Sequence, residues 1–187
     1  MGSDKALLEL NGKPLIALGL EALARFPEII ISAANAETYA PFTGANVRIV
    51  PDELPGIGPL GGIISALKAA SFDHICFRPV DAPLIPPQLH KILLTEPKGD
   101  GSCGTPFDAA VPTYRGNPEP LLACFSKTAL PVLESLTAEG KYKAAEAFPL
   151  LNTYYIDLET PELISLLGDP AVYLINANTP ETFQKLT

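Results

Sequence analysis

Two lysines near the start of the sequence, Lys5 and Lys13, are eight positions apart and lie on either side of a short apolar run. A lysine ammonium is a compact cation on a flexible stem, which makes it a natural partner for phosphate oxygens. The pair is therefore a candidate for neutralising a polyphosphate. The alternative interpretation is that both lysines are solvated surface side chains, which is the common situation for lysine.

Asp81 directly follows the apolar run His74–Val80, which predicts a strand. Pro79 and Pro83 restrict the backbone on both sides of it. A carboxylate held in this way can bind Mg²⁺, which proteins hold through one or two carboxylates together with phosphate oxygens. The alternative is that Asp81 caps the helix expected next. We expect Arg78, inside the same run, to extend its guanidinium to the edge of the sheet.

Asp52 follows a second apolar run, Val47–Val50, in the same way. Its two oxygens can together accept the N1–H and the amino group of guanine, whereas adenine presents an acceptor there and would be rejected. The alternative is an Asx turn that opens the proline-rich loop. Gly61 and Gly62 then allow close approach of backbone to a base or phosphate, and the helix start that they form favours negative charge.

Composition excludes several classes of function. The chain has 13 Lys and Arg against 21 Asp and Glu, a net charge of −8, which argues against a non-specific nucleic-acid binder. Its three cysteines show no CxxC spacing, so we expect neither structural zinc nor a disulfide framework, and a reducing cytoplasm. No secretory signal or apolar run of membrane-spanning length is present, so we expect no membrane partner.

The pattern of apolar residues predicts one α/β domain over residues 1–187, in which strands alternate with helices. Strands are predicted at Glu28–Ser32, Val47–Val50, His74–Val80, Ala109–Pro112, Leu121–Phe125, Thr153–Asp157 and Ala171–Ile175. Helices are predicted at Pro14–Phe26, Gly61–Ala70, Pro87–Leu94, Thr128–Glu139 and Lys141–Phe148, and from Thr179 onward. Such a three-layer domain, with a mostly parallel sheet, binds ligands beyond the carboxyl ends of its strands. Ser32, Asp52, Asp81 and Asn176 are therefore candidates.

The opening stretch, MGSDKALLELNGKPLI, resembles the RMG-x-DKALL-x-x-x-GKPL signature of the MobA-like nucleotidyltransferase family, which includes molybdenum cofactor guanylyltransferase. The resemblance continues in order through Val50–Glu53, Gly58–Gly62, Pro79–Pro83, Glu119–Leu121 and Asn176–Pro180, and covers nearly the whole chain. It implies a Rossmann-like αβα sandwich of the nucleotide-diphospho-sugar transferase type with a mixed sheet. It also implies transfer of GMP from Mg²⁺-bound GTP to molybdopterin, or its molybdenum form, with release of pyrophosphate.

The resemblance assigns catalytic roles to Lys5 and Asp81, with Asp81 as the magnesium ligand. It assigns substrate or metal contacts to Lys5, Lys13, Ser32, Asp52, Gly61, Gly62, Asp81, Asn176 and Asn178. The two asparagines would share one face if the segment is extended; alternatively they serve the loop and the capping role of Thr179. The implied partners are GTP, molybdopterin, and molybdoenzymes or other proteins of molybdenum cofactor biosynthesis.

In this family the signature follows a central strand and a glycine-rich loop, L-A-G-G-x-S-x-R, that wraps the triphosphate. The present sequence begins at the Met of the signature. We therefore expect unpaired backbone edges in the sheet and weak or absent catalysis by the 187-residue chain. Two other functions stay open: cytidylyl or sugar-phosphate nucleotidyl transfer, and non-catalytic cofactor binding by an accessory protein.

Overall fold

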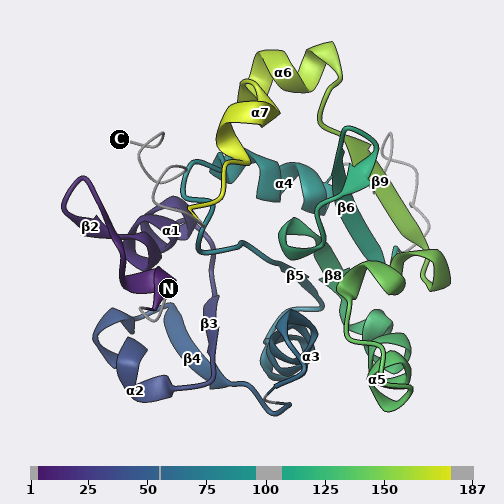
Figure 1. The fold of residues 1–187 in the computed structure, drawn as a ribbon, viewed down its shortest axis with the longest axis horizontal. Helices are drawn as coiled ribbons and strands as arrows, with labels where there is room; N and C mark the ends of the chain where they lie inside the picture. Colours follow the sequence, from purple (N-terminus) through teal and green to yellow (C-terminus); the bar gives the residue numbers. More distant parts are fainter. Residues whose placement is uncertain (1–3, 55, 96–106, 178–187) are drawn as a thin grey trace.

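The computed structural model describes residues 4–54, 56–95 and 107–177, and contains short strands and helices in alternation (Figure 1). The strands are β1 (Glu9–Leu10), β2 (Lys13–Pro14), β3 (Ile29–Ala33), β4 (Val47–Pro51), β5 (His74–Cys76), β6 (Ala109–Tyr114), β7 (Asn117–Pro118), β8 (Cys124–Ser126) and β9 (Thr153–Asp157). The α-helices are α1 (Leu15–Leu23), α2 (Ala36–Tyr39), α3 (Pro59–Ala69), α4 (Pro87–Thr95), α5 (Leu130–Ala138), α6 (Pro161–Leu167) and α7 (Pro170–Tyr173). Single 3₁₀ turns are η1 (Lys5–Leu7), η2 (Ala40–Phe42), η4 (Pro120–Leu122), η5 (Lys127–Ala129), η6 (Ala144–Glu146) and η7 (Phe148–Leu150).

The main strands form two separate sheets. Strands β3 and β4 pair in parallel, with Ile29 opposite Val47. The other sheet has five strands in the order β5-β8-β6-β7, with β9 added to β6. In it β6 and β9 are parallel, whereas β5, β7 and β8 pair antiparallel. The predicted α/β class with a mixed sheet is confirmed. The prediction of a mostly parallel sheet was wrong, because three of the four pairings in the five-stranded sheet are antiparallel.

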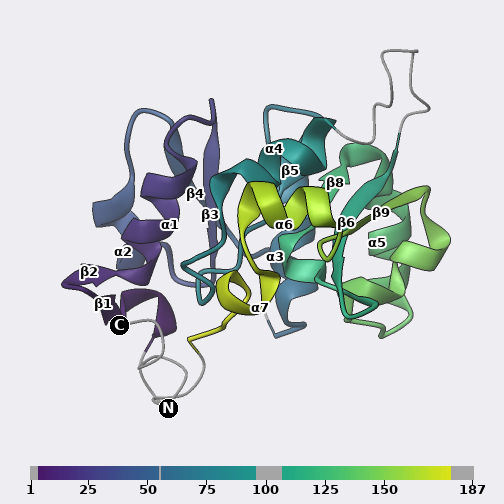
Figure 2. The same cartoon turned by 90° about the horizontal axis from the view of Figure 1, so that it is seen from above.

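Helices cover both faces of the five-stranded sheet (Figures 1 and 2). On one face, α3 and α5 pack on Val111 and Phe125. On the other, α4 packs on Ala110 and Cys124. Consecutive strand residues therefore enter opposite cores, as the period of two in a β-strand requires. This alternation produces the three layers.

The sheet is interrupted between β3 and β5. Among the described residues no strand pairs with the second edge of either. A cavity of about 530 Å³ lies between them, lined by residues of β3, β5, α3 and α4; we call it the inter-sheet cavity. The fully buried His90 lines it, and neither ring nitrogen makes a well-formed hydrogen bond, although the backbone of Phe77 and Pro87 lies nearby. Burial lowers the pKa of His90 to about 4.

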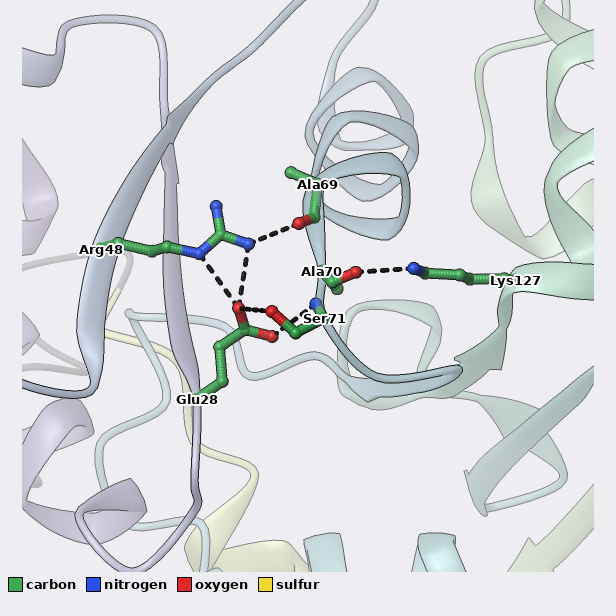
Figure 3. A network of polar contacts seen from close by, with 6 residues as sticks. All are labelled: Glu28, Arg48, Ala69, Ala70, Ser71 and Lys127. Carbon is green, nitrogen blue, oxygen red and sulfur yellow. Dashed lines mark hydrogen bonds and ion pairs between the residues drawn. The ribbon is translucent and has the colours of Figure 1, made fainter.

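A network of polar contacts links the β3–β4 pair to the end of α3 (Figure 3). Arg48 donates from Nε and Nη2 to Glu28 Oε1, both at 3.0 Å, and from Nη2 to the Ala69 carbonyl. Ser71 donates its N–H and its hydroxyl to Glu28. Burial raises the pKa of Glu28, but these hydrogen bonds outweigh it and the net pKa is lowered. From the other sheet, Lys127 donates to the Ala70 carbonyl at 2.6 Å, so both sheets are attached to one helix end.

Most of the predicted elements are present, and four predictions were wrong in whole or in part. The strand predicted at His74–Val80 ends at Cys76 as β5, and Pro79, which has no N–H to donate, lies beyond its end. Lys141–Phe148 forms no α-helix but extended chain and the turn η6, with η7 following. Ala171–Ile175 is not a strand, because Asp169 caps the short helix α7 and Pro170 starts it. The first residues of Leu121–Phe125 lie in η4, so β8 starts only at Cys124. The helix predicted from Thr179 lies outside the described residues. Within the described ranges no helix has the length and apolar character needed to cross a bilayer.

Candidate functional site

The start of α3 packs closely against the ends of β3 and β4. A Cβ on Gly61 would lie 2.7 Å from the Leu54 carbonyl oxygen and 2.8 Å from an Asp52 carboxylate oxygen. A Cβ on Gly62 would lie 2.8 Å from Ser32 Oγ, which donates a hydrogen bond to the Gly62 carbonyl. The structure therefore brings together four of the predicted residues: Ser32, Asp52, Gly61 and Gly62. We call them the α3 group.

Asp52 uses one carboxylate oxygen within its own loop. Oδ1 accepts a hydrogen bond from the Leu54 N–H at 2.9 Å, which is the Asx turn that the sequence offered as an alternative. Oδ2 has no hydrogen-bond partner among the described residues. Asp52 therefore supports the turn and still presents a free oxygen. The role of Asp52 in reading a base stays a prediction.

Sequence reasoning missed Ser65, which fixes this loop to the helix. The buried Ser65 hydroxyl donates to the Gly61 carbonyl and accepts from the Glu53 N–H, both at 2.9 Å. The available signal was a lone hydroxyl in the apolar helix GGIISALKAA, where a buried polar group needs a partner.

Asp81 and Asn176 lie together in a second place, a cavity of about 260 Å³ that also contains Glu119; we call it the Asp81 cavity. The Ala177 N–H donates to the Asp81 carbonyl at 2.6 Å and so attaches the Asn176 segment to the Asp81 loop. The Asp81 carboxylate accepts no hydrogen bond within the described ranges, and α4 starts only at Pro87. The capping alternative for Asp81 therefore finds no support.

Arg78 holds the loop that follows Asp81, rather than extending to the sheet edge as we expected. Its guanidinium donates to the Ile85 carbonyl at 2.7 Å and to the Pro83 carbonyl at 2.9 Å. Burial lowers the pKa of Arg78 to about 10, so it remains a cation at neutral pH. A fixed fork of donors can hold two carbonyls at once, which the single ammonium of lysine cannot do in the same geometry.

The two lysines lie in the segment that precedes α1. Lys5 is in the exposed turn η1, where Asp4 caps the turn and accepts a hydrogen bond from the Tyr39 hydroxyl at 2.6 Å. Lys13 forms an ion pair of 2.8 Å with Glu21, with side chains 54% and 59% exposed, so solvent screens the pair strongly. Nothing in the sequence pattern pointed to Glu21.

A third apolar core places this segment beside the Asp81 cavity. Leu10 and Leu15 pack with Ala177, and Val80 and Ile175 pack against them. Val80 precedes Asp81, and Ile175 and Ala177 flank Asn176. Asn178 lies outside the described residues. The candidates therefore form two groups, the α3 group and the Asp81 cavity, with the lysine segment packed beside the second.

The donor atoms of the Asp81 cavity suit magnesium. The Asp81 carboxylate and the Asn176 amide supply the hard oxygen ligands that Mg²⁺ prefers. In the part of the chain that the structure describes, no three His, Cys, Asp or Glu side chains gather closely enough to hold a metal alone. Mg²⁺ usually takes one or two carboxylates and completes its shell with water and phosphate oxygens, so these residues fit that ion.

Comparisons with known proteins identify relatives along the whole chain. The probable molybdenum cofactor guanylyltransferase of Pelotomaculum thermopropionicum is 32% identical over 99% of this chain and 84% of that protein. The molybdenum cofactor guanylyltransferase of Vibrio atlanticus is 32% identical over 96% of this chain and 84% of that protein.

Solved structures agree in fold. The molybdopterin-guanine dinucleotide biosynthesis protein A of Archaeoglobus fulgidus matches with a TM-score of 0.79 and 27% identity, over 99% of this chain and 89% of that one. The 2-C-methyl-D-erythritol 4-phosphate cytidylyltransferase of Thermus thermophilus matches with a TM-score of 0.69 and 16% identity, over 99% of this chain and 92% of that one, a likeness of fold alone. Residues 1–150 match the family described as the MobA-like NTP transferase domain. The chain belongs to this family of nucleotidyltransferases.

Proposed function

We propose that this protein is a molybdenum cofactor guanylyltransferase that transfers GMP from GTP to molybdopterin and releases pyrophosphate. The observation that best supports this proposal is the Asp81 carboxylate, which lines a cavity, makes no hydrogen bond to the described residues, and lies in a loop that Arg78 and Ala177 both fix. The names of the relatives support the choice of guanine and of the acceptor. Cytoplasmic location follows as part of the proposal, since the acceptor is made by cofactor biosynthesis.

The α3 group is assigned to the nucleotide. The first N–H groups of a helix and its dipole favour an anion, and glycines at this start permit backbone to approach a flat base. The Asp52 oxygen that makes no hydrogen bond to the described residues would accept one donor from the guanine edge. Ser32 lies beside Gly62 and adds a hydroxyl.

The Asp81 cavity is assigned to the reacting phosphates. Asp81 would hold Mg²⁺, with the Asn176 amide beside it; the ion, when bound, neutralises charge on phosphate oxygens. The terminal phosphate oxygen of molybdopterin attacks the α-phosphorus of GTP in line. One P–O bond forms, the bond from the α-phosphorus to the bridging oxygen breaks, and pyrophosphate leaves. Lys5, with Lys13, offsets the charge that develops on the leaving group, and the residues act by positioning and electrostatics.

The test compares Asp81→Asn with the exposed control Asp73→Asn in single-turnover assays with GTP, molybdopterin and Mg²⁺. We expect Asp81→Asn to slow transfer by about 100-fold or more, the usual cost of removing one transition-state charge contact, while Asp73→Asn retains the wild-type rate. Transfer from CTP in place of GTP would contradict the choice of nucleotide. Transfer that survives Asp81→Asn unchanged would contradict the assigned role.

A non-catalytic cofactor-binding protein is a second candidate, and the separation of the two sheets favours it. In-line transfer requires both substrates to be held rigidly, whereas the α3 group lies at the ends of β3 and β4 and the Asp81 cavity lies at loops of the other sheet. Calorimetric titration separates the candidates: a binding protein takes up the pterin without taking up GTP, whereas a transferase binds both.

A further inference from the structure

The side chain of Glu119 lines the Asp81 cavity, and among the described residues it makes no contact that supports the fold. Its backbone is fully used, since its N–H donates to the Pro112 carbonyl at 2.9 Å and its carbonyl accepts from the Leu122 N–H at 3.0 Å. Its carboxylate is half-buried and, within the described ranges, has neither a hydrogen bond nor an ion pair. A carboxylate removed from water without a partner costs free energy, so the fold gains nothing from it.

The walls of the cavity indicate what that carboxylate faces. Apart from Asp81, Glu119 and Asn176, every lining side chain is apolar, including Leu121, Leu122 and Leu174. Apolar walls that carry a few polar groups are typical of a site for an organic ring, and such a ring could lie beside the Mg²⁺ that Asp81 would hold. At about 260 Å³ the space is small, which suits a ring system better than a whole nucleotide.

We propose that Glu119 determines acceptor specificity by accepting two hydrogen bonds from the amino-pyrimidinone edge of a pterin. That edge presents a ring N–H and an exocyclic amino group side by side, and a carboxylate accepts both together. This inference rests on the proposed function, in which molybdopterin is the acceptor. It assigns to Glu119 the reading of the ring and leaves the phosphates to Asp81.

Burial supports the same assignment, because it raises the pKa of the Glu119 carboxyl. A carboxylate that lacks water gains more from two added donors than an exposed one does. The hairpin β6–β7 and the turn η4 fix the backbone on both sides, so the side chain is presented from a rigid base.

The test pairs two probes with two variants. Pterin (2-amino-4-oxopteridine) carries both donors; lumazine (2,4-dioxopteridine) has a carbonyl where pterin has the amino group. Their intrinsic fluorescence reports binding to the whole 187-residue chain without any transfer. The test variant is Glu119→Gln, which retains the shape of the side chain, and the control is Glu162→Gln on the exposed face of α6.

We expect the wild-type chain and Glu162→Gln to bind pterin at least 10-fold more tightly than lumazine. Glu119→Gln should weaken the binding of pterin about 10-fold and change the binding of lumazine by less than 2-fold. It should leave the midpoint of thermal unfolding unchanged. An equal loss for both probes, or no loss for pterin, would overturn the inference. A changed Mg²⁺ requirement in Glu119→Gln with unchanged pterin binding would also overturn it, since Glu119 would then be a metal ligand.

GTP binding separates this inference from the proposed function. If GTP binds normally and the affinity for pterin is the same in Glu119→Gln as in the wild type, only the role assigned to Glu119 is wrong. If Glu119→Gln weakens pterin binding as expected while GTP neither binds nor reacts, the acceptor site is supported and the transferase assignment is wrong.

Discussion

The five-stranded sheet and the β3–β4 pair are stabilised in different ways. The five-stranded sheet lies between two apolar cores that contain its own alternate residues. The β3–β4 pair has buried side chains at Ile29, Ile31 and Val50, which belong to neither core. It is attached through the Glu28 network and through the start of α3.

This difference matters because the candidate site draws on both regions. Ser32 is in β3 and Asp52 directly follows β4, whereas Asp81 lies in the loop after β5 and Glu119 directly follows β7. The distance between a bound nucleotide and an acceptor therefore depends on α3 and on a few polar contacts. Each prediction below perturbs one of the regions or the contact between them.

Phe125→Ala should have the largest effect. Phe125 is fully buried and stacks on Phe148 at 5.8 Å between ring centroids, so its removal leaves a cavity in the stronger region. We expect a loss of about 3–5 kcal/mol in the free energy of unfolding, measured by urea titration. Ile31→Ala in β3 should cost less, about 2 kcal/mol, the low end for such a truncation. Equal losses from the two variants would contradict the conclusion that the two regions are stabilised differently.

Acid should destabilise the protein through His90 at the inter-sheet cavity. The folded-state pKa is about 4, below the ordinary value of 6.5, because burial and then Arg78 disfavour the cation. As pH falls below 6.5 the unfolded state binds the proton first, so stability is fully present above 6.5 and is lost toward pH 4, by about 3 kcal/mol in all. Urea titrations at pH 7 and pH 4.5 measure this.

The matched variant for this test is His90→Phe, which keeps an aromatic ring beside Phe26 and cannot titrate. We expect it to remove most of the difference between the two pH values. A difference that persists in full would assign the acid sensitivity to other groups.

Gly61→Ala should disturb the contact between the start of α3 and the loop that follows β4. Its Cβ meets the Leu54 carbonyl oxygen at 2.7 Å, and backbone cannot rotate away as a side chain can. We expect a loss of about 1–3 kcal/mol, typical of overpacking, together with weaker GTP binding by calorimetry. Gly62→Ala is the control, because it meets only the rotatable hydroxyl of Ser32 and should cost less. The reverse order would show that the packing at Gly61 is not the tighter of the two.

Glu28→Gln should have the smallest effect and a local one. It weakens the hydrogen bonds from Arg48 and Ser71 and should cost about 1 kcal/mol. Because the pKa of Glu28 is lowered on folding, its contribution is present above pH 4.5 and disappears as pH falls through the folded-state value. Hydrogen exchange should accelerate at β3 and β4 amides and stay unchanged at β6 and β8; a uniform change would mean that the two regions open together.

The sequence predicted best where one periodic signal sufficed. The apolar runs Glu28–Ser32 and Val47–Val50, and the helical pattern of Gly61–Ala70, each indicated an element that the structure contains within two residues of those bounds. The prediction was wrong at Ala171–Ile175, where β-branched and aromatic residues suggested a strand but the Asp169 cap and Pro170 start a helix.

For the site, the pattern indicated single residues and not their supports. Gly61 and Asp52 could be named because glycines and a carboxylate after a strand are visible in the sequence. Ser65, the Arg78 contacts to Pro83 and Ile85, and the Asp4–Tyr39 hydrogen bond depend on how distant segments meet. The spacing of residues along the sequence does not indicate such contacts, so they could not be predicted from the sequence alone.

The hydrogen bond from Ala177 to Asp81 joins positions 96 residues apart in the chain. During synthesis, at roughly 5–20 residues per second, the Asp81 loop is therefore made roughly 5–20 s before its last support. A released chain that ends before Ala177 should contain the five-stranded sheet with the loop held by Arg78 alone, so we expect full competence to bind magnesium only in a chain that includes Ala177.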